Sequence, residues 1–403
     1  MNKKLLSLGM AFTMGMTVLA GCTSSDTTTT TTAAAGGETT AAETSADGGE
    51  TTAADAGGKK KIGVAMPTQS LERWNRDGSY LKEKFEEKGF EVKLTFSDNK
   101  IDQQVKDLEG LISDNVSLLV IAAIDGESLS QVLADAKAAN IPVISYDRLI
   151  MNTDAVSYYV SFDNYTVGKL QGQFVENALD LKNAGDKSYN IEFTAGDPAD
   201  NNATFFFNGA YDVLKPYIES GVLKVPSGQT EFDKVATPKW DTAKAMERMQ
   251  NILGSYYTDA QLDVALCSND STALGVTQAI GTDYNGKNSV IITGQDGDVA
   301  NLANIVDGKQ TMTVYKAVAN EAVATIDLGL ALLEGKTPDE GLISEAGWGF
   351  EVAYDTKSYN NNVADIPSYL LVPTVVTKDN IQKELVDTGY YTLDDKGYPQ
   401  ATK

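Results

Sequence analysis

The chain has 403 residues, a formal net charge of −23, two cysteines and no histidine. Such an acidic balance argues against a nucleic acid as partner, because the phosphate backbone would repel the protein. The absence of histidine excludes Ser/His/Asp and Cys/His catalysis, and it removes the commonest transition-metal ligand.

Residues 1–21 have the pattern of a secretory signal peptide. Lys3 and Lys4 precede an apolar stretch that ends in small residues, and the stretch is too short to be read first as a membrane span. Its end, Leu19-Ala-Gly-Cys22, resembles the bacterial lipobox, in which the cysteine is acylated. We therefore expect Cys22 to be the lipidated first residue of the mature protein. An ordinary signal peptide or a membrane anchor is the alternative.

Residues 22–58 continue with Thr, Ala, Gly, Ser and acidic residues, and no large apolar side chain follows the cysteine. Such a segment buries too little surface to offset the entropy that ordering would cost. We expect it to be a lipid-anchored, disordered linker. The acidic folded part beyond it would stay soluble close to an anionic membrane surface.

From residue 59 onward, predicted strands and helices alternate. Apolar runs predict strands, and apolar residues at helical spacing predict helices. In the first block, strands are expected at 60–66, 90–96, 118–124, 141–146 and 156–162, and helices at 74–88, 102–113 and 129–140. Alternating β and α elements with short connections predict a doubly wound parallel sheet.

The alternation then starts again. The second block has predicted helices at 165–181, 201–214, 241–253 and 271–280, and strands at 189–194, 262–267 and 290–293. Two successive blocks of similar size predict an α/β fold of two doubly wound parallel-sheet lobes joined by a hinge. We expect the N-terminal lobe to comprise 59–163 and 316–340, and the C-terminal lobe to comprise 164–315 and 341–403.

Polar clusters follow the predicted buried strands. Asp147 and Arg148 come directly after the strand at 141–146, and a core cannot hold such charges unpaired. Open α/β sheets bind ligands beyond the carboxyl ends of their strands. Similar positions are taken by Arg73 with Trp74, Asp200 with Asn202, Asn269, Asp296 and Lys316.

Structural alternatives remain open for these residues. Asp147 and Arg148 could be a structural ion pair, and Trp74 could pack against its own sheet. Asp200 and Asn269 stand where a helix N-cap is expected, Trp240 could be a hydrophobic staple, and Lys316 could be solvated. Asp296 and Asp298 suggest calcium, but the spacing of a calcium loop is missing, so we expect no metal.

Taken together, these side chains are typical of a sugar site. Charged groups make paired hydrogen bonds to neutral hydroxyls, and aromatic rings cover C–H faces. A phosphate ligand would call for a Gly-rich loop or a helix-terminus nest, and neither motif is present. We expect no cofactor.

Several short sequence motifs, occurring together in this order, resemble those of a known family. The motifs are Ser70-Leu-Glu-Arg-Trp74, Tyr146-Asp-Arg-Leu-Ile150, Asp200-Asn-Asn-Ala203, Ser268-Asn-Asp270, Gly294-Gln-Asp296 and Thr311-Met-Thr-Val-Tyr-Lys316. Over residues 60 to about 391, the chain resembles the periplasmic sugar-binding proteins of ABC transporters, class I of the periplasmic-binding-protein fold. The multiple-monosaccharide-binding and xylose-binding proteins are the most similar branches.

The resemblance implies a binding site for glucose, galactose, arabinose or xylose. Two rings, Trp74 and Trp240, would stack on opposite faces of the sugar, and Asp270 and Gln295 would lie behind the direct contacts. The full set implied to bind the sugar is Arg73, Trp74, Asp147, Arg148, Asp200, Asn202, Trp240, Asn269, Asp296 and Lys316.

The resemblance also implies the biological role. A monomeric two-lobe clamp, anchored outside the cytoplasm by its lipidated cysteine, would close on the sugar and deliver it to an ABC transporter permease without chemistry. A sugar sensor that presents its ligand to a chemoreceptor or sensor kinase is one alternative. A glycosidase using Asp147 and Asp296 is a second. A repressor of the same fold is a third, but a signal peptide stands where its helix-turn-helix would be.

Overall fold

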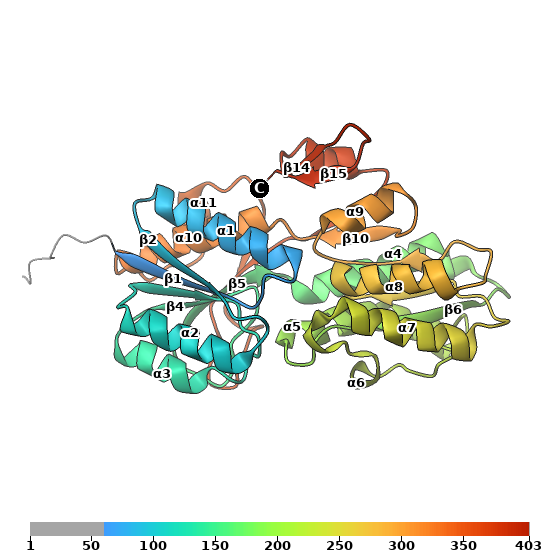
Figure 1. Cartoon of the computed structure of the whole chain (residues 1–403), viewed down its shortest axis with the longest axis horizontal. Helices are drawn as coiled ribbons and strands as arrows, with labels where there is room; N and C mark the ends of the chain where they lie inside the picture. Colours follow the sequence, from blue (N-terminus) through green and yellow to red (C-terminus); the bar gives the residue numbers. More distant parts are fainter. Residues whose placement is uncertain (1–59, 403) are drawn as a thin grey trace, which may run out of the picture. The chain divides into compact units, whose positions relative to one another are not determined.

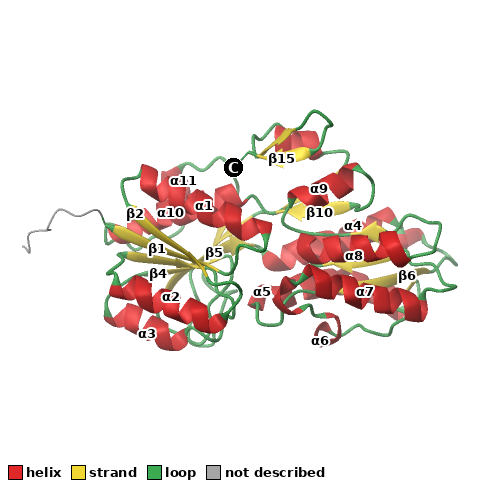
Figure 2. Ribbon diagram, in the orientation of Figure 1, coloured by secondary structure: helices red, strands yellow, loops and turns green. Residues whose placement is uncertain are grey.

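The computed structural model describes residues 60–402, so the predicted signal peptide, Cys22 and linker lie outside the described residues. The described part contains two main β-sheets, each covered by helices (Figures 1 and 2). We call the part built on the seven-stranded sheet the first lobe, and the part built on the four-stranded sheet the second lobe. The predicted α/β class with two parallel-sheet lobes is confirmed.

The first-lobe sheet has the order β11-β12-β5-β4-β3-β1-β2. All neighbours are parallel except β11 and β12, which pair antiparallel. Helices cover both faces of this largely parallel sheet, so its central strands are buried along their length, and this explains their apolar sequences. The strands are β1 (Lys61–Met66), β2 (Glu91–Phe96), β3 (Leu118–Ile121), β4 (Val143–Tyr146), β5 (Val156–Phe162), β11 (Val352–Asp355) and β12 (Ser368–Leu371).

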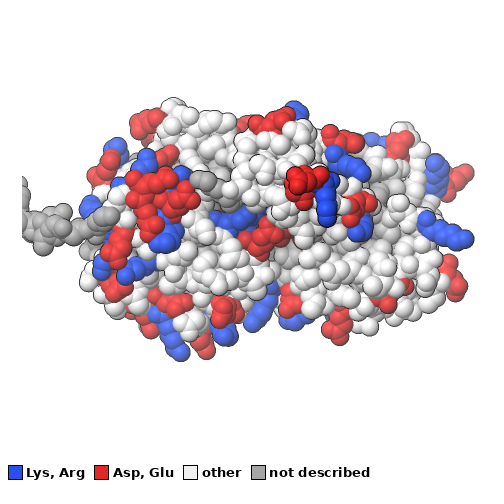
Figure 3. Space-filling view, turned by 45° about the horizontal axis from the view of Figure 1, so that its top comes forward, with Lys and Arg blue, Asp and Glu red and all other residues white. Residues whose placement is uncertain are grey.

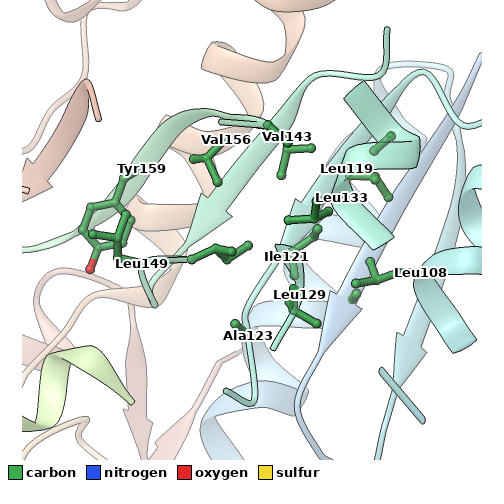
Figure 4. Close-up of a cluster of buried hydrophobic side chains, with 14 of the residues drawn as sticks. Leu108, Leu119, Ile121, Ala123, Leu129, Leu133, Val143, Leu149, Val156 and Tyr159 are labelled. Atoms are coloured by element: carbon green, nitrogen blue, oxygen red, sulfur yellow. The ribbon is translucent and has the colours of Figure 1, made fainter. Parts of the chain in front are cut away.

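Two hydrophobic clusters hold the helices to the two faces of this sheet. One cluster joins the sheet to α2 and α3 through side chains such as Leu108, Leu119 and Leu133 (Figure 4). The other joins it to α1 and α10 through side chains such as Leu81 and Leu328. The helices are α1 (Glu72–Glu87), α2 (Ile101–Ser113), α3 (Ser130–Ala138), α10 (Val318–Leu333) and α11 (Gly341–Ala346).

The second-lobe sheet has the order β7-β6-β8-β9 and is parallel. A bridge from Gln295 to Val314 leads from the end of this sheet to the antiparallel pair of β10 and β13. The strands are β6 (Tyr189–Thr194), β7 (Leu223–Lys224), β8 (Val264–Cys267), β9 (Ile291–Ile292), β10 (Met312–Tyr315) and β13 (Thr374–Thr377).

Alternation along β8 assigns the helices to the two faces of the second sheet. Val264 and Leu266 pack with α4 and α5, whereas Ala265 and Cys267 pack with α7 and α8. The helices are α4 (Asn164–Ala178), α5 (Asn201–Glu219), α6 (Phe232–Val235), α7 (Thr242–Tyr256), α8 (Asp270–Asp283) and α9 (Val299–Val306), with the short turns η1 (Leu181–Asn183) and η2 (Pro238–Trp240).

The C-terminal segment departs from the expected assignment. We expected 341–403 in the second lobe, but β12 pairs with β5, which places β11 and β12 in the first-lobe sheet. The reason is that the edge of β5 is free to accept a parallel strand, and Ser368–Leu371 is fully buried against it. The chain then returns to the second lobe at β13, followed by η3 (Gln382–Val386), β14 (Tyr391–Leu393) and β15 (Pro399–Ala401). The other boundaries stay as predictions.

Candidate functional site

One pocket brings together all ten side chains expected to bind a sugar. They reach it from the loops and helix starts that follow β1, β4, β6, β8, β9 and β10 and from η2, as expected for a site beyond the carboxyl ends of parallel strands. The lining residues are Leu71, Arg73, Trp74, Asp147, Arg148, Asp200, Asn202, Phe206, Trp240, Asn269, Ser271, Gln295, Asp296 and Lys316.

The Asp147 carboxylate is the centre of a buried charge cluster. Its Oδ2 lies 2.7 Å from Nη1 of Arg73, and its Oδ1 lies 3.0 Å from Nζ of Lys316. All three side chains are at most 7% exposed. The alternative that Lys316 is solvated is therefore wrong, and its ammonium also lies 5.3 Å from the ring centre of Phe162.

The surrounding cations determine the charge state of this carboxylate. Burial alone would raise the pKa of Asp147, but the cations of Arg73, Lys316 and Arg148 together bring it below its ordinary value. The carboxylate therefore stays ionised at neutral pH. It can accept hydrogen bonds from hydroxyl groups, and it is poorly suited to donate a proton.

The backbone at Asp147 is held in an uncommon conformation. Its φ is +58°, which costs energy in a residue other than glycine and persists only where the surroundings over-determine it. Its carbonyl oxygen accepts hydrogen bonds from the Tyr159 hydroxyl at 2.7 Å, the Ser161 hydroxyl at 2.8 Å and the Asn202 amide at 2.6 Å. These bonds fix the turn after β4, so the carboxylate and the guanidinium that follows it point to defined partners.

Arg148 joins the two lobes beside this centre. Its Nε lies 3.0 Å from Oδ2 of Asp200 in the second lobe, and its Nη1 donates to the carbonyl of Ala123 at 3.0 Å. The guanidinium carbons of Arg73 and Arg148 each lie 4.9 Å from the ring centre of Trp74, a cation–π geometry. Asp147 and Arg148 thus each have partners other than one another.

The second lobe contributes Trp240, whose backbone has an uncommon conformation. Trp240 has a φ of +53°, and Lys239 before it has a φ of +65°. The indole Nε1 donates to Oδ2 of Asp200 at 3.2 Å, and the ring packs against Phe206. A Cβ on Gly196 would lie 1.9 Å from the Trp240 ring, so only glycine leaves room for the indole there.

Helix starts supply the remaining second-lobe groups. Asp200 caps α5 by accepting from the Asn202 backbone, and Asn269 caps α8 in a capping box with Thr272. The capping alternative is therefore correct for both residues, and both also line the pocket. Capping fixes the side chains at positions where their remaining polar atoms face the cleft.

Asp296 is the second carboxylate that meets first-lobe charge. Its Oδ1 lies 3.5 Å from Nη1 of Arg73 and 3.9 Å from Nζ of Lys316, and its Oδ2 lies 3.4 Å from Nδ2 of Asn269. Its φ is +103°. Like Asp147, it is held in a strained backbone among fixed donors.

Several residues at or behind the site did not stand out in the sequence. Leu71, Phe206 and Ser271 line the pocket without a polar strand-end pattern. Gln295, expected behind the direct contacts, also lines it, whereas Asp270 is fully buried and bonds Gln310, Thr313 and the backbone of Asp298. Glu321, the fully buried one of the two acids in the apolar helix Val318–Leu333, was not predicted to belong to the site.

A second group of contacts joins α1 to the second lobe outside the pocket. Arg76 donates to Asp298 at 3.3 Å and to the Tyr391 hydroxyl, and Glu72 accepts from the backbone of Val299 at the start of α9. The pKa of Asp298 is raised to about 7, mainly by burial; the nearby carboxylates of Asp296 and Glu72 contribute to the rise, and the Arg76 cation opposes it. This carboxyl group therefore titrates close to neutral pH.

Charges of both signs are mixed over the face drawn in Figure 3, and acidic side chains gather over part of the first lobe. Within residues 60–402, no helix combines the length and the apolar content that crossing a membrane would require.

The comparisons with known proteins agree with this geometry. A family model described as a periplasmic binding protein domain matches residues 62–337. The multiple sugar-binding periplasmic receptor ChvE of Rhizobium radiobacter is 42% identical over 84% of this chain and 93% of its own length. The D-xylose-binding periplasmic protein of Escherichia coli is 34% identical over 82% of this chain and 91% of its own length.

Solved structures match as well. An ABC transporter solute-binding protein from Clostridium phytofermentans with bound β-D-glucose is 47% identical, has a TM-score of 0.77, and is matched over 83% of this chain and 98% of its own. A carbohydrate transporter solute-binding protein from Chloroflexus aurantiacus in complex with D-glucose is 30% identical, with a TM-score of 0.71 over 83% and 98% of the two chains. With the two-lobe fold and the cleft between its parallel sheets, these matches show that the chain belongs to the family of periplasmic binding proteins, among the sugar-binding solute receptors of ABC transporters.

Proposed function

We propose that this protein captures an aldose monosaccharide, with D-glucose as the first candidate and galactose, xylose and arabinose as related ligands. The observation that carries the proposal is the convergence of ten side chains, nine after strand ends and Trp240 from η2, on one pocket between the lobes. Two structural relatives, 47% and 30% identical to this chain, hold glucose, and their likeness supports the same ligand class here.

The polar chemistry of the pocket suits a neutral ligand rich in hydroxyls. A hydroxyl both donates and accepts, so it can satisfy a carboxylate on one side and a guanidinium or ammonium on the other. A sugar between Arg73, Asp147 and Asp296 would find both kinds of partner, with the rings of Trp74 and Trp240 against its C–H faces. The other proposed contacts are Arg148, Asp200, Asn202, Asn269 and Lys316.

Closure on the ligand explains how a site without chemistry is used. The groups of the first lobe meet those of the second only when the cleft is shut, so a ligand that bridges them favours the shut form. We propose that a permease of an ABC transporter recognises this form and receives the sugar. Lipid anchoring through Cys22 and a monomeric state belong to the same proposal.

Binding without catalysis is favoured over glycoside hydrolysis. The glycosidase alternative would use Asp147 with Asp296, and its general acid must hold a proton near neutral pH; the lowered pKa of Asp147 makes that residue unsuitable for the role. The relatives with the greatest coverage are named as binding proteins. Release of reducing sugar from a glycoside by the purified protein would contradict this part of the proposal.

A thermal-shift screen tests the proposal, because a ligand that binds only the native state raises the melting temperature by mass action. The purified protein is heated with D-glucose, D-galactose, D-xylose and L-arabinose, and with sorbitol as an open-chain control. We expect at least one ring sugar to raise the melting temperature and sorbitol to leave it unchanged. If no ring sugar raises it, the proposed ligand class is wrong.

A further inference from the structure

Arg73 is held from behind by two acids that do not reach the pocket. Its Nε donates to Oδ2 of Asp77 at 3.2 Å, and its Nη2 donates to Oε2 of Glu321 at 2.8 Å. Asp77 and Glu321 are both fully buried, and neither lines the pocket. Only Nη1 is directed at the pocket carboxylates, 2.7 Å from Asp147 and 3.5 Å from Asp296.

A guanidinium is a rigid planar fork, so fixing two of its nitrogens fixes the direction of the third. The acids that fix it are themselves held in place. The Tyr146 hydroxyl at the end of β4 donates to Oδ1 of Asp77, and Glu321 belongs to the buried face of α10. Three elements of the first lobe, α1, β4 and α10, therefore determine where Nη1 points.

Burying an acid on an otherwise apolar helix face is costly unless the acid is paired. Glu321 has one pairing, to Arg73, and its other oxygen, Oε1, is buried without a hydrogen-bond partner. Glu321 lies near the charges of Asp147, Arg73, Asp77 and Lys316, and the one that its side chain bonds is Arg73. The placement is therefore explained by what Glu321 does to Arg73.

We propose that Glu321 and Asp77 are positioning residues of the sugar site, which aim Nη1 of Arg73 at a ligand hydroxyl without touching the ligand. The inference rests on the proposed function. It assigns part of the binding affinity to a residue that is 248 positions away from Arg73 in the chain.

The contact to Arg73 needs an acceptor oxygen and no negative charge. Burial, followed by the nearby Asp147 carboxylate, raises the pKa of Glu321 well above its ordinary value, and the Arg73 cation opposes that rise. In either protonation state the carboxyl group can accept from Nη2 through Oε2. A glutamine keeps such an oxygen and a leucine does not, which makes the two substitutions a sharp pair.

The test measures the affinity for D-glucose by titration calorimetry, with melting temperature in parallel. Glu321→Leu should weaken binding about tenfold to a hundredfold, the range for losing a hydrogen bond to a charged group. Glu321→Gln should restore most of that loss. The matched control is Glu192→Leu, which removes another fully buried acid, one that accepts from Ser227 and Tyr257 and does not line the pocket. The control should lower the melting temperature and leave the affinity within about twofold.

A double-mutant cycle separates aiming from general stability. In an Arg73→Gln background, Glu321→Leu should change the affinity by less than about twofold, because no guanidinium is left to aim. Additive losses would overturn the proposal, and so would wild-type affinity in Glu321→Leu. If Glu321→Leu does not fold, Asp77→Leu is put through the same cycle, with the same expected and contradicting results.

Failure of the inference can be told from failure of the proposed function. If the wild-type protein binds glucose and Glu321→Leu binds it equally well, only the inference is wrong. If the wild-type protein binds no sugar at all, the proposed function is wrong and the inference fails with it.

Discussion

The first lobe contributes mainly cations to the cleft, and the second lobe contributes mainly carboxylates. The first lobe supplies the guanidiniums of Arg73 and Arg148, and the second supplies the carboxylates of Asp296 and Asp200 that they meet. In the other direction, Lys316 at the crossing from β10 to α10 reaches Asp147 of the first lobe. Each lobe thus carries charges whose partners lie across the cleft.

This difference between the lobes fits the proposed closure on the ligand. Buried charges are tolerated only when they are paired, and separating the lobes would expose these groups to water. A sugar hydroxyl that both donates and accepts can stand between a cation of one lobe and an acid of the other. Substitutions that change one lobe at a time should therefore change the sugar affinity by different amounts, from a large loss at the central acid to none outside the pocket.

Removing the central acid should have the largest effect. Asp147→Ala leaves Arg73 and Lys316 without the carboxylate that they share, and breaking such a buried pair costs about 3–5 kcal/mol. We expect glucose binding to fall at least about a hundredfold in calorimetry, with a lower melting temperature. Asp154→Ala, which removes an exposed acid paired with Lys137, is the control. Normal binding by Asp147→Ala would show that Asp147 is only structural.

Neutralising one acid of the second lobe should weaken binding less. Asp200→Asn keeps the N-cap of α5, since asparagine caps well, but it removes the charge that meets Arg148. The loss of one charge-assisted bond predicts a decrease in affinity of about tenfold or more. Asp241→Asn alters the cap of α7 away from the pocket and should bind normally. Equal behaviour of the two variants would argue against cross-lobe pairing as a source of affinity.

Displacing the second-lobe ring should have a smaller effect. In Gly196→Ala the new methyl group would clash with the Trp240 ring, and overpacking of this kind costs about 1–3 kcal/mol. We expect the indole to shift and glucose affinity to drop about tenfold. Gly254→Ala in α7 has free space around the added methyl group and serves as the control. An unchanged affinity in Gly196→Ala would mean that Trp240 does not contact the ligand.

The pH dependence of stability should change without a change in affinity. Asp298 has a pKa of about 7 in the folded protein and an ordinary value near 4 when unfolded. Between these values the folded state holds a proton that the unfolded state has lost, so this group makes stability fall as the pH rises from about 4 to about 7. Asp298→Asn removes that dependence.

The melting temperature of Asp298→Asn relative to the wild type should therefore increase between pH 5 and pH 8. A constant difference across this range would show that Asp298 does not titrate near neutral pH. Glucose affinity is measured at both pH values, and we expect Asp298→Asn to bind as the wild type does, in contrast to the pocket variants.

The strand-end argument located the pocket because parallel strands bring their carboxyl ends to one edge. Arg73, Asp147 and Asp296 are far apart in the chain, yet each follows an apolar strand, and the fold brings them together. The same pattern could not identify Asp77 and Glu321, since they lie within helices and act through Arg73.

The sequence pattern also could not predict which sheet the C-terminal segment joins. A short apolar strand such as Ser368–Leu371 looks the same whichever sheet it joins. The choice depends on which sheet edge is open, and that edge, on β5, is set by elements some 200 residues earlier. Likewise, the need for glycine at position 196 arises only from contact with Trp240.

The most direct test of the account is a crystal structure of the protein with D-glucose. The account predicts one sugar ring in the pocket between Trp74 and Trp240, with Nη1 of Arg73 and the carboxylate of Asp147 within hydrogen-bonding distance of its hydroxyls. A sugar bound elsewhere, or no sugar in a pocket whose lobes are shut at saturating glucose, would contradict it.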